Sequence, residues 1–136
     1  MKTLSLLSVV VYLAITGFLY QNKPLEESIR EGAILYQDFC LQCHMANGEG
    51  VPGTFPPLAQ SDYLRNELEK SIQGVKYGMR GPLVVNGTTY NGIMVAQGLD
   101  DEEVADIMNY VLQSWGNAGD IQVTETQVAA IKRPSY

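Results

Sequence analysis

The feature that most constrains this chain is the pentapeptide Cys-Leu-Gln-Cys-His at residues 40–44. Two cysteines separated by two residues, with a histidine directly after the second, are the attachment pattern of a c-type haem. Each thiol adds across one vinyl group of the porphyrin, and the histidine binds the iron from beneath the ring. The motif contains every cysteine and histidine of the chain. It therefore predicts one haem c held by Cys40 and Cys43, with His44 as an iron ligand.

Three other interpretations compete for the same residues. A structural zinc site needs four protein ligands, and the chain has no further cysteine or histidine to complete one. A thioredoxin-like redox pair needs a βαβ context, whereas the sequences that flank the motif look helical. The third alternative is a chance occurrence with no cofactor. We favour haem attachment, because the pattern downstream of the motif agrees with it.

Length and charge limit the class of partner. With 136 residues, the chain is one domain with short additions. Its formal net charge of −6 at pH 7 argues against nucleic acid as a partner, because binding to phosphates needs a basic surface.

The N-terminal segment is an export signal or a membrane anchor. Residues 4–20 carry no charge and are mostly apolar, and Lys2 precedes them. Their length is at the lower edge of what spans a bilayer, and they contain a poor cleavage pattern, so we favour the uncleaved anchor. Lys2 would then stay inside and the domain would lie outside the membrane. We divide the chain into residues 1–22, signal peptide or anchor, and residues 23–136, the exported domain, joined by a leash at residues 21–27.

The segment before the motif carries a helical pattern. Pro24 suits a helix start, and apolar residues recur at helical spacing as far as Cys40. Gly32 lies inside this helix, where glycine costs up to about 1 kcal/mol relative to alanine. We interpret it as a point of close approach to another helix rather than a tolerated defect.

The clearest helix is predicted over residues 100–115. An Asp-x-x-Glu capping box begins it at Asp100, and apolar residues form a stripe along it. This helix is the natural partner of the first one, and we expect Tyr110 or Trp115 to approach Gly32 closely.

The remaining segments show weaker patterns. Residues 62–74 indicate one short helix. Residues 75–98 are rich in glycine and indicate a loop, with at most two short extended pieces on either side of a tight turn at Asn86-Gly87. A further capping-box pattern at Thr124 predicts a short final helix.

Residues 45–58 contain three glycines and three prolines, which excludes regular structure. We expect this loop to wrap one edge of the haem. The second nitrogen of a ligand histidine is usually held by a carbonyl or a carboxylate, and the carbonyl of Pro56 is our candidate for His44. The alternative is that the prolines only stiffen the loop.

A closed haem site needs a sixth iron ligand, and a methionine thioether in that position raises the potential. Three methionines are set aside by position: Met1 is in the export segment, Met45 adjoins the ligand histidine, and Met108 lies on an apolar helix face. Met79 and Met94 both lie in the glycine-rich loop. The spacing of residues does not choose between these two.

Taken together, these residues resemble a class I c-type cytochrome from about residue 28 to residue 133. The resemblance includes the haem motif, Val-Pro-Gly-Thr-Phe-Pro-Pro-Leu at 51–58, Tyr-Asn-Gly-Ile-Met at 90–94 and Leu-Asp-Asp-Glu-Glu-Val at 99–104. The chain is similar in particular to the small cytochrome c units that serve bacterial copper nitrite reductases and membrane-bound dehydrogenases. This resemblance implies an all-α fold, with three to five helices around one covalently attached haem and an N-terminal apolar helix outside the domain.

The resemblance also implies roles for single residues. His44 and Met94 would be the axial ligands, which decides between the two methionines. Pro56 would accept a hydrogen bond from His44, and Leu58 and Ile93 would touch the ring. The family usually has a proline directly after the ligand methionine, whereas this chain has Val95.

From these observations we expect a single-electron carrier with one haem c, periplasmic or at the outer face of the inner membrane. It would not be an enzyme itself, and its partners would be a donor and an acceptor redox protein, associated with the membrane. One alternative is a dedicated electron-transfer subunit of a membrane oxidoreductase complex. The other is a ligand-binding haem sensor or weak haem enzyme, which needs an open iron site.

Overall fold

The computed structural model describes residue 12, residues 23–117 and residues 119–135. The predicted signal or anchor at residues 1–22 therefore lies outside the described residues, apart from Tyr12. Among the residues described, no helix has the length and apolar character needed to cross a membrane.

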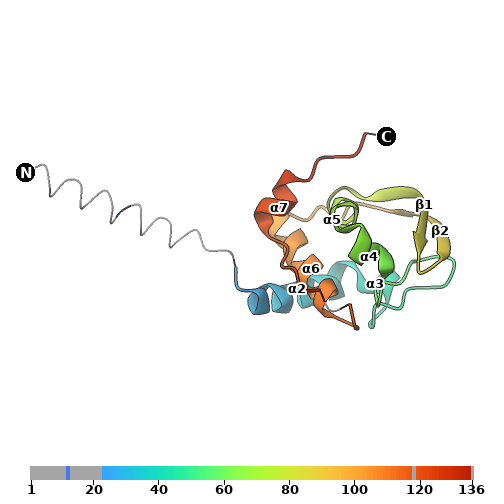
Figure 1. Cartoon of the computed structure of the whole chain (residues 1–136), viewed down its shortest axis with the longest axis horizontal. Coiled ribbons are helices and arrows are strands. Elements are labelled where there is room, and N and C mark those ends of the chain that lie inside the picture. The colour runs from blue at the N-terminus through green and yellow to red at the C-terminus, as the bar shows by residue number, and fades with distance from the viewer. Residues whose placement is uncertain (1–11, 13–22, 118, 136) are drawn as a thin grey trace, which may run out of the picture.

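Six helices and one two-stranded sheet are formed by the described residues (Figure 1). In chain order they are α2 Leu25–Phe39, α3 Leu41–His44, α4 Asp62–Asn66, α5 Leu68–Tyr77, β1 Met79–Val85, β2 Thr88–Met94, α6 Asp101–Gln113 and α7 Glu125–Ala130. The fold is helical, as predicted, but it contains a hairpin, and it has more helices than the three to five expected. The extra helices arise because α3 is separate from α2 and because residues 62–77 form two helices.

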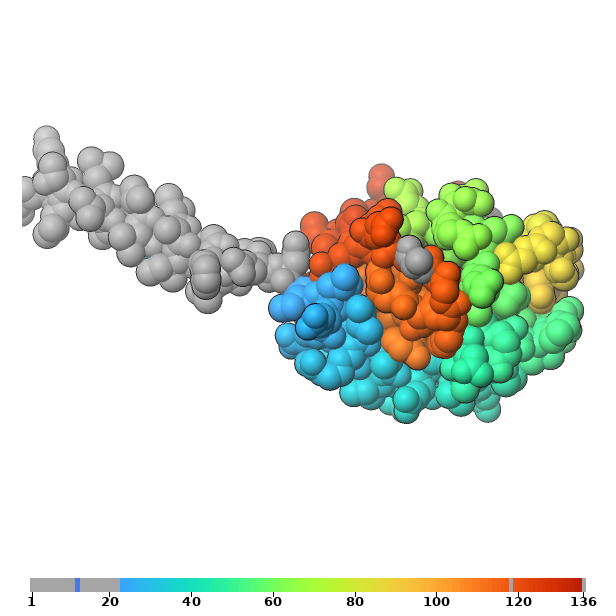
Figure 2. All heavy atoms as spheres, turned by 60° about the horizontal axis from the view of Figure 1, so that its bottom comes forward, coloured from blue at the N-terminus to red at the C-terminus, as the bar shows by residue number. Residues whose placement is uncertain are grey.

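Helices α2 and α6 cross at Gly32, as the sequence predicted. A Cβ atom on this glycine would overlap the carbonyl oxygen of Asp106 and lie 2.9 Å from Cβ of Tyr110. The ring of Tyr36 packs beside the rings of Tyr110 and Trp115, at centroid distances of 5.4 and 5.1 Å. Figure 2 shows the blue residues of α2 directly against the orange residues of α6. This crossing is the main helix contact of the domain and supports the end of α2, where the haem motif begins.

Lys23 ties the start of the described domain to α6. Its Nζ atom lies 2.7 Å from Oδ2 of Asp106 and 2.6 Å from Oε1 of Glu102. The other carboxylate oxygen of Asp106, a residue only 4% exposed, accepts a hydrogen bond of 2.6 Å from Ser28 Oγ. The Lys23 carbonyl also accepts a bond from Gln122. The predicted leash at residues 21–27 is therefore wrong from Lys23 onward, because these residues are bonded to the domain or helical.

We expect Lys23→Met to lower the free energy of unfolding at neutral pH, because the buried Asp106 carboxylate loses its cation. The expected loss is only about 1–2 kcal/mol, because the Lys23 side chain is partly exposed and solvent screens the pair. Partial burial disfavours the charged ammonium, but the bonds to Asp106 and Glu102 outweigh it and raise the pKa of Lys23 above its usual 10.5. The contribution of this ion pair to stability is therefore fully present below about pH 10.5 and is lost as pH rises through the raised pKa of Lys23. Urea unfolding of both proteins at several pH values measures it.

Arg30→Met is the matched control for this substitution. The side chain of Arg30 is 65% exposed, and its guanidinium lies 3.8 Å from a carboxylate oxygen of Glu31, so its loss should change stability by less than about 0.5 kcal/mol. Equal effects of the two substitutions would contradict the role assigned to Lys23.

The prediction of one helix over residues 62–74 is wrong. Helix α4 is capped by Ser61, whose Oγ accepts from the amide of Leu64 at 3.3 Å. It ends at Asn66, because the next residue, Glu67, has φ −131° and ψ 49° and so interrupts the helical geometry. Helix α5 begins at the next residue and continues to Tyr77, beyond the predicted end, until Gly78 with φ +79° terminates it.

Residues 79–94 form a hairpin where a loop was predicted. Strands β1 and β2 pair antiparallel from Met79↔Met94 to Val85↔Thr88. The predicted turn is confirmed: Asn86 and Gly87 have φ values of 50° and 76°, as a type I′ turn requires. Pro82 fits because both strands of a two-stranded sheet are edge strands.

The C-terminal residues pack on α5 and α6. The predicted capping box of the final helix is present between Thr124 and Gln127, and Val128 is fully buried. Two side chains of α5 donate hydrogen bonds to carbonyls of this segment: Lys76 to Val128 at 2.8 Å and Tyr77 to Ile131 at 3.0 Å. The tail therefore holds the helix that leads directly into the hairpin.

Candidate haem site

The motif residues are presented by one helical turn. Cys40 caps the C-terminal end of α2 and the N-terminal end of α3, which follows it directly. Residues three apart on a helix share a side, so Cys40 and Cys43 face the same way, and both are free thiols. Burial, followed by the nearby Cys43, raises the pKa of Cys40 to about 11. Both sulfurs line one wall of the same cavity, which suits addition to two vinyl groups of one ring.

His44 is held with one ring nitrogen engaged. Its Nδ1 lies 3.0 Å from the carbonyl oxygen of Pro56. A carbonyl only accepts, so Nδ1 carries the proton and Nε2 keeps a free lone pair. Burial lowers the pKa of His44, and the bond to Pro56 opposes this only in part. The imidazole is therefore neutral and oriented, which is the state that binds iron.

The loop that supplies the Pro56 carbonyl is shaped by Gly50. This glycine has φ +63°, and a Cβ atom there would lie 2.7 Å from the Pro56 oxygen. The Gly50 amide donates to the His44 carbonyl at 3.0 Å. Tyr36 supports the same turn from the other side, because its hydroxyl donates to the carbonyl of Met45 at 2.7 Å. The chain thus closes around His44 through backbone contacts that a larger residue at position 50 would prevent.

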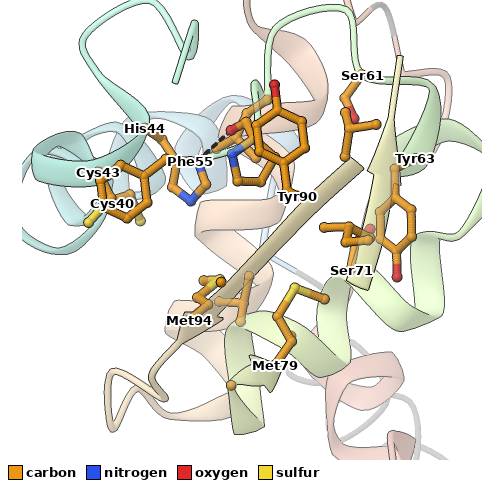
Figure 3. Close-up of a pocket in the computed structure, with 18 of the residues that line it drawn as sticks. Cys40, Cys43, His44, Phe55, Ser61, Tyr63, Ser71, Met79, Tyr90 and Met94 are labelled. Atoms are coloured by element: carbon orange, nitrogen blue, oxygen red, sulfur yellow. Dashed lines mark hydrogen bonds between the residues drawn. The ribbon is translucent and has the colours of Figure 1, made fainter. Parts of the chain in front are cut away.

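A cavity of about 350 Å³ opens in front of these residues (Figure 3). It lies between α3, the loop after it, α4, α5, the hairpin and α6, and its size is within the usual range for a cofactor pocket. Its inner wall is apolar and includes Leu64, Ile107, Met108 and Val111. Two thiols, one imidazole, thioethers and apolar walls are the donor set and surroundings that a covalently bound haem requires, so the residues present fit this group.

All seven residues singled out in the sequence line this one cavity, namely Cys40, Cys43, His44, Pro56, Leu58, Ile93 and Met94. Ile93 is 76% exposed and lies at the mouth rather than inside. Tyr63 and Tyr90 are among the other lining residues, which were not singled out. Tyr90 lies in the same pentapeptide as Met94 and is only 7% exposed, so the pentapeptide itself was the available signal. Tyr63 gave no signal in the sequence.

Met79 and Met94 both line the cavity. They lie directly opposite each other as a register pair of the hairpin. The arrangement therefore brings together the two methionines between which the residues alone did not choose.

Fold and site together define a protein that binds one haem covalently within a small helical domain. The chain matches the family model for cytochrome c over residues 29–115. It is 43% identical over 94 residues to cytochrome c-552 of Thermus thermophilus, a match that covers 65% of this chain and 70% of that protein. The chain therefore belongs to the cytochrome c family. Its cofactor is covalently attached haem c, and its function is electron transport.

Longer relatives match as well. The cytochrome c subunit of a quinone alcohol dehydrogenase from Gluconobacter oxydans is 31% identical over 115 residues, covering 77% of this chain and 24% of that protein. Subunit CcoP of a cbb3-type cytochrome c oxidase from Rhodobacter capsulatus is 30% identical over 96 residues, covering 65% of this chain and 31% of that protein. The chain thus spans about a quarter to a third of these two subunits.

Proposed function

We propose that this cytochrome c is a single-electron carrier with a closed haem site, in which His44 and Met94 are the axial ligands. The observation that carries the proposal is the His44 imidazole, held neutral with Nδ1 bonded to Pro56 and Nε2 available. The thioether of Met94 lines the same cavity from the hairpin. The haem supplies the one-electron change of its iron. The chain supplies two fixed ligands and a largely apolar enclosure.

Other residues have supporting roles in this proposal. Cys40 and Cys43 attach the ring, and Leu58 and Ile93 contact it from the loop and from the hairpin. The Pro56 carbonyl accepts a hydrogen bond from Nδ1 of His44. This bond fixes the orientation of the imidazole ring and makes Nε2 a better electron-pair donor to iron. Because Ile93 is at the mouth of the cavity, this edge is where a redox partner comes nearest to the ring.

We further propose that residues 23–136 form the exported domain and that residues 1–22 are a signal or anchor. The partners would be redox proteins of a membrane, at the outer face of the inner membrane or in the periplasm. Relatives named as subunits of a dehydrogenase and of an oxidase support this. The first turn of α2 and the hairpin lie at opposite sides of the domain (Figure 1). A tether before Lys23 would therefore leave the hairpin side of the cavity free for docking.

A dedicated subunit of a membrane complex is the second candidate, and the same subunit relatives favour it. Purification of the tagged full-length chain from its own membranes in mild detergent separates the two. A free carrier elutes without a partner in fixed ratio, whereas a subunit retains a dehydrogenase, oxidase or reductase in a constant stoichiometry.

The electron-carrier proposal is tested by redox titration of the full-length protein, produced in a host that attaches haem c. We expect one reversible one-electron transition per haem, with an unchanged haem spectrum after repeated cycles. A ferric iron that takes up external ligands such as azide as readily as an open site does would contradict the closed site and favour the sensor or enzyme alternative.

The proposed ligand is tested by Met79→Ala and by the double variant Met79→Ala/Met94→Ala. We expect Met79→Ala to keep the weak long-wavelength absorption band of a methionine–iron bond, because Met94 remains. The double variant should lose this band and become high-spin, while its haem stays covalently attached through both cysteines. Loss of the band in Met79→Ala alone would contradict ligation by Met94.

A further inference from the structure

We infer that Met79 is a second, alternative iron ligand of this site: its thioether takes the same coordination position when Met94 leaves it. This inference rests on the proposed ligation by His44 and Met94. It concerns a residue to which the resemblance assigns no role.

The hairpin register is the first observation that supports it. Met79 begins β1, Met94 ends β2, and the two are directly paired. Directly opposite residues of an antiparallel pair point to the same face of the sheet, with Cβ atoms about 4.5–5.5 Å apart. The backbone hydrogen bonds of the hairpin therefore place the Met79 and Met94 side chains next to each other on one face of the sheet.

The cavity is the second observation. Both side chains are half-buried and line it. Figure 3 shows them at the same end of the cavity, with His44 at another side of it. Met79 thus shares both a strand face and a cavity with the proposed ligand, whereas Met108, which also lines the cavity, lies on α6.

Helix α5 provides a resting place for the Met79 thioether. A Cβ atom on Gly74 would lie 2.9 Å from Cε of Met79 and 3.3 Å from its Sδ. The end of the side chain thus packs where Gly74 lacks a side chain. This position explains why Met94, and not Met79, is the ligand in the resting state. Methionine is unbranched and has three rotatable side-chain bonds, so the thioether can leave this place without movement of the strand.

Residues beside the two methionines permit local adjustment. Gly78, directly before Met79, has φ +79°. Val95, directly after Met94, is 64% exposed and lacks the fixed φ that a proline would impose. The paired strands keep the two residues together. Gly78 packs against the backbone of residues 94–96, so the adjustment at Met79 lies in its side chain, whereas the exposed Val95 leaves the chain after Met94 free of a proline's constraint.

The exchange is chemically balanced without any further reagent. The bond between iron and the Met94 sulfur breaks, and a bond between iron and the Met79 sulfur forms. No electron, proton or leaving group is transferred, because both donors are neutral thioethers. The consequence is an iron that remains six-coordinate and closed to small ligands when Met94 is displaced or lost.

The test compares the full-length haem protein with three variants: Met94→Leu, Met79→Leu and the double variant. Leucine conserves apolar volume and cannot bind iron. The readouts are the long-wavelength band of the ferric protein and, in ferrous protein labelled with ¹³C-methyl methionine, the one methyl resonance that the ring shifts far upfield. Retained far-ultraviolet circular dichroism and covalent haem show that each variant is folded.

We expect Met94→Leu to retain the band and a shifted methyl resonance, and the double variant to lose both. If Met94→Leu is folded and resembles the double variant, the inference is wrong and Met79 is only a packing residue. If Met79→Leu loses both signals while Met94→Leu is unchanged from the original protein, the proposed ligation by Met94 fails instead. If Met94→Leu does not fold, the upfield region of the original protein decides: a second, exchanging methionine methyl supports the inference, and its absence contradicts it.

Discussion

Replacement of both Cys40 and Cys43 by alanine is expected to abolish covalent haem attachment. The two thiols are free, face one cavity and lie three residues apart on a helical turn. No other cysteine exists to form a thioether. The original protein should keep its haem through a denaturing gel and through extraction with acidified organic solvent, and the double variant should release all of it.

Leu41→Ala is the control for this prediction. Leu41 lies between the two cysteines, is 39% exposed and does not line the cavity. Its variant should retain covalent haem, which shows that a change within the motif is tolerated when both thiols remain. Covalent haem in the Cys40→Ala/Cys43→Ala variant would contradict the site as described.

Gly32→Ala should destabilise the domain by about 3 kcal/mol or more, at the upper end of the range for overpacking. The added methyl group would overlap the backbone carbonyl of Asp106, and backbone does not move aside as a flexible side chain does. Helices α2 and α6 would have to separate, and α2 carries Cys40 at its end. Urea unfolding of the haem protein, followed by circular dichroism, measures the loss.

The neighbouring substitution Ala33→Gly serves as the control. It changes one methyl group on the same helix at a half-buried position, and it should cost only about 1 kcal/mol through helix propensity. If Gly32→Ala is no worse than Ala33→Gly, the close crossing of the two helices is not a strong constraint on the fold.

Local chemistry explains which parts of the fold were predictable from the sequence. The capping box at Asp100 and the turn at Asn86-Gly87 depend on neighbours within a few residues, and the structure confirms both. Gly32 was predictable because a glycine inside a helix indicates close approach of another helix, although its contacts with Asp106 and Tyr110 lie far along the chain. The contact between His44 and Pro56 could also be predicted from the local sequence, because a glycine- and proline-rich loop directly follows the motif.

The missed features carry no clear signal in the composition of their own residues. Strands β1 and β2 are interrupted by Gly81, Pro82 and Gly92, so they lack the composition that predicts strands, and only their mutual hydrogen bonds form the hairpin. The division of the helix at Glu67 has no glycine or proline to indicate it.

The same limit applies to single residues. The role of Lys23 depends on Asp106, a carboxylate 83 residues away. The pairing of Met79 with Met94 depends on the register, and it is invisible in a linear reading of the sequence.

The most direct test of the account is the absorption spectrum of the ferric full-length protein, produced in a host that attaches haem c. We predict a low-spin spectrum with the weak long-wavelength band of a methionine–iron bond, since the proposed ligands, a neutral His44 and a hairpin thioether, line one cavity. A high-spin spectrum without that band would contradict the closed site, and with it the central claim that this cytochrome c is an electron carrier.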